Sequence, residues 1–185
     1  MNRRTKIVYI SGGIGLILII TVVTLYLLQY KYRRYTDKAR GFSIEYPAQW
    51  EIMKDYGGAA VVFKSPLDGP LDVFHENVNI VVQDISHDPL SLREYSDRAI
   101  YQMEVTFMQN FELEESTAVA TLGGYPAYKI IFTGHGPNTE LRYYMTWIVL
   151  DKVKAYQVNY TALPSQFDKY DLMVERMLAS FKVLR

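Results

Sequence analysis

The chain of 185 residues contains no cysteine, which excludes disulfide bonds, thiolate metal ligands, a cysteine nucleophile and a lipid-modified cysteine. It also lacks a phosphate-binding loop, because its glycine pairs at 57–58 and 123–124 have neither of the known spacings. No serine or threonine beside His87 or His135 occupies a recognisable nucleophile turn, so these histidines fit polar surface better than acid/base catalysis. We therefore expect a protein that is not an enzyme and has no resident cofactor.

Charge is absent from Ile7 to Leu28, a run of 22 residues. About 20 apolar residues in a helix span the roughly 30 Å hydrocarbon core of a bilayer. The sequence thus predicts a basic tail over 1–6, a transmembrane helix over 7–30, a basic juxtamembrane linker over 31–40 and a soluble domain over 41–185. A cleaved signal peptide is the alternative, but its apolar region is usually 7–15 residues long and ends in a small-x-small site, which is missing here.

The net charge of zero hides an asymmetry. Residues 1–40 carry a net charge of +7 and residues 41–185 carry −7. The acidic domain has no basic stripe, which argues against nucleic-acid binding, whereas the bases and tyrosines that flank the apolar run suit lipid headgroups. Three bases and the α-amine precede the run and five bases follow it, so by the positive-inside rule the charges are nearly balanced or slightly favour a cytoplasmic domain. Because moving the charged tail outward is unfavourable, we expect a single-pass cell-membrane protein with an extracytoplasmic domain.

Strands are predicted wherever apolar and polar residues alternate. These segments are 42–46, 59–64, 77–85, 114–122, 125–133, 140–150 and 154–163. Gly123-Gly124 suits a type I′ hairpin turn, and residues 67–76 are too irregular for a regular element.

Two helices are predicted from capping residues and apolar stripes. Ser91 with Glu94 forms a capping box for a first helix, and Ser165 with Asp168 resembles one for a second helix. Successive strands joined by tight turns, with helices between runs of strands, favour an antiparallel sheet and the α+β class.

Four segments carry a resemblance to a known family. They are GFSIEYPAQWEI, ENVNIVVQDI followed by SLREY, TLGGYPAYKIIFT, and SQFDKYDLMVERMLASFKV. Together they resemble the PsbP domain, which shares a superfamily with the Ran-binding Mog proteins, and the resemblance covers nearly all of residues 41–183. It implies a central antiparallel sheet of about six strands with helices on both faces, an α/β/α sandwich. The family includes an extrinsic subunit of photosystem II, but a shared fold does not establish a shared function.

Three groups of residues are candidate sites. Asp68, Asp72, His75 and Glu76 offer oxygen and imidazole donors in one loop, which could hold a divalent metal, although the alternative is a solvated acidic loop. Arg142 and Tyr144 are candidates for a partner interface, because tyrosine and arginine often anchor interfaces; sheet packing is the alternative for most of the tyrosines. Ser11, Gly12 and Gly15 form a small-residue patch that could pack against another membrane helix.

The leading hypothesis is a membrane-anchored, non-enzymatic accessory subunit that docks on or stabilises an integral membrane protein complex. The alternative is an accessory protein that binds a small ligand or a divalent metal through the Asp68–Glu76 loop.

Overall fold

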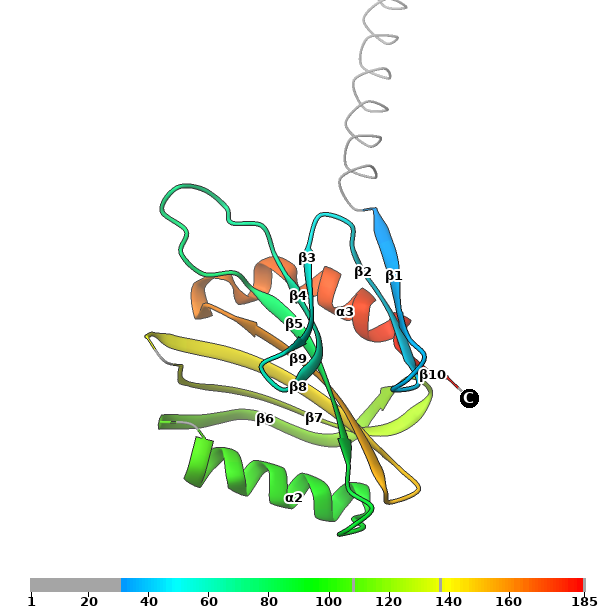
Figure 1. Ribbon diagram of the computed structural model, residues 1–185. Coiled ribbons are helices and arrows are strands. Elements are labelled where there is room, and N and C mark those ends of the chain that lie inside the picture. Colours follow the sequence, from blue (N-terminus) through cyan, green and yellow to red (C-terminus); the bar gives the residue numbers. More distant parts are fainter. Residues whose placement is uncertain (1–30, 108, 137, 185) are drawn as a thin grey trace, which may run out of the picture.

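The computed structural model describes residues 31–107, 109–136 and 138–184 (Figure 1). Its strands are β1 (Tyr32–Asp37), β2 (Phe42–Pro47), β3 (Glu51–Tyr56), β4 (Ala59–Lys64), β5 (Asn77–Asp84), β6 (Gln109–Leu122), β7 (Tyr125–His135), β8 (Glu140–Leu150), β9 (Lys154–Ala162) and β10 (Lys182–Val183). Its helices are α2 (Leu92–Gln102), a π-helical turn η1 (Met103–Phe107), a 3₁₀ helix η2 (Pro164–Tyr170) and α3 (Asp171–Ser180).

Seven strands form one antiparallel sheet in the order β3-β4-β5-β9-β8-β7-β6. A second, three-stranded sheet has the order β1-β2-β10. Figure 1 shows α2 on one face of the large sheet, with α3 and the small sheet on the other. The expected α+β class and antiparallel sheet are confirmed. The resemblance implied about six strands, whereas the large sheet has seven.

The hairpin turns follow from residues that tolerate positive φ. Gly123 and Gly124 have φ of 61° and 84°, the pair of left-handed residues that a type I′ turn requires, so the predicted hairpin between β6 and β7 is confirmed. Asp151 and Lys152 adopt the same conformation between β8 and β9, with φ of 50° and 61°.

The two helices begin in different ways. Ser91 caps α2 as predicted: its side chain accepts the Glu94 amide, and the Glu94 carboxylate accepts the Ser91 amide at 2.8 Å. The prediction of a second capping box is wrong, because a 3₁₀ helix precedes α3 and no side chain caps either segment. Pro164 at the start of η2 fixes that turn instead.

The hydrophobic core has one part on each face of the large sheet. Neighbouring residues of β8 divide between them: Trp147 packs under α2, while Ile148 packs on the side of α3. Five apolar residues of η2, α3 and the position just after α3 are buried on the α3 side, namely Phe167, Tyr170, Val174, Met177 and Phe181. Alternation along the strands therefore builds two separate apolar layers.

Three strands were not predicted from the sequence, namely β1, β3 and the two-residue β10. Residues 31–40, expected as a linker, contain β1, which pairs with β2 from Tyr32↔Pro47 to Asp37↔Phe42. This corrects the expected start of the folded domain at residue 41. β3 lies at the edge of the large sheet and is largely exposed, so its residues do not alternate cleanly. The expected loop before β5 is confirmed.

Candidate functional site

The loop between β4 and β5, residues 65–76, is closed at its base by Ser65 and Glu76. The Ser65 amide donates to the Glu76 carbonyl at 2.8 Å, and the Ser65 hydroxyl donates to the Glu76 carboxylate at 3.0 Å. Glu76 is buried, and its other carboxylate oxygen has no hydrogen-bond partner among the described residues. A compact loop whose ends lie close together matches the Ω-loop type, which often has a functional role.

The remaining predicted metal ligands bond to different groups. Asp68 forms an ion pair with Lys169, and the ring of His75 lies with Nδ1 2.6 Å from the Ser65 carbonyl oxygen. Asp72 accepts the amides of Asp68 and Phe74, and these bonds lower the pKa of its carboxyl. Within the described ranges, no three histidine, aspartate or glutamate side chains converge as metal ligands. The metal site remains a prediction without support from this arrangement.

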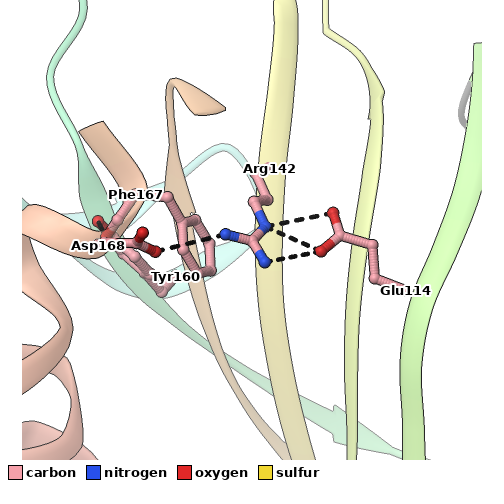
Figure 2. A network of polar contacts seen from close by, with 5 residues as sticks. All are labelled: Glu114, Arg142, Tyr160, Phe167 and Asp168. Atoms are coloured by element: carbon pink, nitrogen blue, oxygen red, sulfur yellow. Dashed lines mark hydrogen bonds and ion pairs between the residues drawn. The ribbon is translucent and has the colours of Figure 1, made fainter. Parts of the chain in front are cut away.

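Arg142, on β8, reaches across β7 to Glu114 on β6 (Figure 2). Its Nη2 lies 2.7 Å and its Nε 3.0 Å from one Glu114 oxygen, and Nη1 donates to Asp168 at 3.4 Å. The guanidinium also stacks on the ring of Phe167, 4.3 Å from its centroid. The tip of this candidate interface residue is therefore occupied by contacts within the domain.

Tyr144 packs on the α3 side of β8, the face opposite Trp147, as the alternation predicts. It is partly buried, and burial together with the nearby acidic side chains raises the pKa of its hydroxyl. Lys129 lies over its ring at 5.3 Å. Tyr144 also lines a groove of about 580 Å³ between the β6–β7 hairpin and α3, so it remains accessible to a partner.

A pocket of about 390 Å³ under α2 was not predicted from the sequence. Three of its polar side chains form a relay of hydrogen bonds, in which Gln157 donates to the Tyr95 hydroxyl, and Tyr95 donates to Gln83. Burial raises the pKa of Tyr95 to about 12, although the bond from Gln157 opposes the shift. His87 and Arg98 lie at the pocket lining.

The pocket suits a small molecule with an apolar body and a hydrogen-bonding edge. Its volume falls in the usual range for ligand pockets, and apolar side chains such as Met103, Met145 and Trp147 form much of its lining. Sequence reasoning could find the helix that carries Tyr95, but not Gln157, which is 62 residues away.

The membrane predictions fall on residues 7–30, outside the described ranges. This segment includes the small-residue patch of Ser11, Gly12 and Gly15. Among the helices that the structure does describe, none has the length and apolar character needed to cross a bilayer.

Comparison with known proteins places this fold. A model of the PsbP family matches residues 30–183. The solution structure of cyanobacterial PsbP (CyanoP) from Synechocystis has 19% identity and a TM-score of 0.60, with 83% of this chain and 93% of that chain covered. LpqN of Mycobacterium tuberculosis, described as involved in cell envelope biogenesis, has 13% identity and a TM-score of 0.57, covering 86% and 95%.

A protein that is described by a different function has the same fold. The Ran-binding protein Mog1p of Saccharomyces cerevisiae has 9% identity and a TM-score of 0.56, covering 84% of this chain and 96% of its own. At such identities the likeness concerns the fold alone. No curated protein sequence matches the chain.

Proposed function

Because the chain belongs to the PsbP family, we propose that it is a membrane-anchored, non-enzymatic accessory subunit that docks on an integral membrane protein complex. One observation carries the proposal: the apolar run ends at Leu28, and β1 of the folded domain already begins at Tyr32. A domain attached so closely to an apolar segment long enough to cross a bilayer is held beside other membrane proteins.

The contacts of the polar side chains support an accessory role. Arg142, Asp72 and Glu76 each bond within the domain, where they shape a loop or join strands. The groove beside Tyr144 offers a surface for a partner, and the acidic charge of residues 41–185 would select a partner with a basic face. Following the sequence argument, the domain lies on the extracytoplasmic side of the cell membrane.

The test is purification of the full chain from its host membranes in mild detergent after crosslinking. We expect a stoichiometric integral membrane partner. Gly12→Leu combined with Gly15→Leu should release the partner if the small-residue patch packs against it, whereas Ile17→Leu is the matched control in the same apolar run. A chain that is recovered as a monomer from native membranes would contradict docking.

A second candidate function is small-ligand binding, and the pocket under α2 favours it. This location differs from the Asp68–Glu76 loop, where the side chains do not converge. A ligand that binds the folded chain raises its melting temperature with concentration. A monomer stabilised by one ligand, with a change in the fluorescence of the buried Trp147, would favour this function over docking.

A further inference from the structure

One end of the domain exposes apolar side chains. Leu71, Val73 and Leu172 are 95%, 89% and 83% exposed, more than any other large apolar side chain of the described residues. Leu67, in the same loop as Leu71, is 45% exposed. Single exposed leucines are ordinary, but several on one end of a domain indicate a surface that something covers.

Internal bonds hold the loop that carries this apolar surface. The Asp72 carboxylate accepts the amide of Asp68 at 2.8 Å and that of Phe74 at 3.1 Å, which folds the tip. Leu71 and Val73 flank Asp72 in the chain and remain outside this fold. Asp68 also pairs with Lys169, so the carboxylates of Asp68 and Asp72 both have partners. The loop thus presents its apolar side chains to solvent.

The same end of the domain holds the start of β1. Tyr32 is in register with Pro47, close to Trp50, whose ring meets that of Tyr170 edge-on at 5.5 Å. Residue 170 follows Lys169, the partner of the loop, and Leu172 lies two residues further along the chain. Figure 1 shows the loop and the beginning of β1 at the same end of the molecule, with α2 at the other.

The sequence before β1 identifies what covers this end. Leu28, the last residue of the apolar run, precedes Tyr32 by four residues, so about 15 Å of chain at most separates them. Lys31 and Arg33 are exposed around Tyr32, as expected beside anionic lipid headgroups. If the run crosses a bilayer, the exposed leucines face that bilayer.

We propose that Leu71, Val73 and Leu172 insert into the interfacial region of the lipid bilayer and fix the orientation of the domain. The inference rests on the proposed membrane anchoring. Two points of attachment, the chain at Tyr32 and the apolar loop, hold one end of the domain against lipid. The opposite end, with α2 and its pocket, then faces away from the membrane.

The absence of cysteine makes the test direct. Leu71→Cys in the full chain gives a unique thiol for an environment-sensitive fluorophore, and Ser86→Cys is the matched control. Ser86 is exposed just beyond β5, whose eight residues place it about 25 Å from the loop. Each labelled chain is reconstituted into vesicles of phosphatidylcholine and phosphatidylglycerol, with and without spin-labelled lipid, and vesicle flotation checks membrane attachment.

We expect a blue-shifted emission at position 71 that spin-labelled lipid quenches several-fold, and a water-like, unquenched emission at position 86. Equal, water-like emission at both positions in chains that float would overturn the inference and leave the anchoring intact. A blue shift at position 71 without quenching would mean that another copy of the chain covers the loop, which also overturns it. Chains that do not float would refute the membrane anchoring and the inference together.

Discussion

Replacing Arg142 tests whether this residue stabilises the domain or binds a partner. Arg142→Ala removes three hydrogen bonds to Glu114, one to Asp168 and the stacking on Phe167. Because the Arg142 and Glu114 side chains are 27% and 31% exposed, their pairing keeps much of its strength. Asp168 is 85% exposed, so its ion pair contributes only about 0–1 kcal/mol.

The expected loss in the free energy of unfolding is about 2–4 kcal/mol. Hydrogen bonds between charged groups contribute about 1.5–3 kcal/mol, and a partly desolvated cation–π contact adds about 0.5–2 kcal/mol, without full additivity. For a domain of this size, a loss of that magnitude lowers the melting temperature by about 5–15 °C. Urea unfolding in detergent, followed through the fluorescence of Trp50 and Trp147, measures it.

Three variants sharpen the result. Arg142→Lys keeps the charge without the planar fork and should lose an intermediate amount. Arg34→Ala is the matched control, since Arg34 makes a single bond to Glu45 and its side chain is 55% exposed, so it should lose about 0–1 kcal/mol. A double-mutant cycle with Glu114→Ala isolates the pair. If Arg142→Ala unfolded like the unaltered chain yet no longer captured the membrane partner, the structural role would be refuted.

Three further predictions concern a turn, a titration and the loop. Gly123→Ala should lower the free energy of unfolding, measured in urea, by about 1–3 kcal/mol more than Gly124→Ala. Both glycines have positive φ, but only at Gly123 would an added Cβ meet Phe181, at 3.2 Å. Equal losses for the two variants would contradict this. The stability that Tyr95 contributes is complete below its unfolded pKa of 10.0 and is lost as pH rises through its folded pKa of about 12, because the unfolded chain loses this proton first. Tyr95→Phe should therefore flatten the decline of the free energy of unfolding with pH, measured by urea unfolding. An unchanged decline would count against the buried relay. Calorimetric titration with manganese, zinc and calcium should give flat traces, because the side chains of residues 68–76 bond to separate groups. A saturable heat of binding that His75→Ala abolishes would reverse this conclusion.

Features that depend on neighbouring residues could be predicted from the sequence. The capping box of Ser91 and Glu94 spans four residues, and the Gly123-Gly124 turn needs only two, so both follow from local chemistry. β1 could not be predicted in this way. Its tyrosines and bases resemble a membrane-proximal linker, and only pairing with β2 makes them a strand.

The candidate site shows the same division between local and long-range features. Proximity in sequence gathered Asp68, Asp72 and His75 into one hypothesis, but each bonds to a different atom of the loop and its surroundings. The pocket under α2 depends on the contact between Tyr95 and Gln157, which comes from different elements and leaves no local pattern. Loops closed by their own side chains therefore resemble ligand sites in sequence.

The small sheet has a consequence for how the protein is made. β2 lies between β1 and β10, where Phe42 pairs with Val183 and Ser43 with Lys182. A ribosome must therefore add all the intervening residues before β2 gains its second neighbour, which takes on the order of 10 s at about 5–20 residues per second. During that interval the nascent chain carries an open strand edge that can pair with other extended segments. Completion of the domain thus coincides with the synthesis of its last strand.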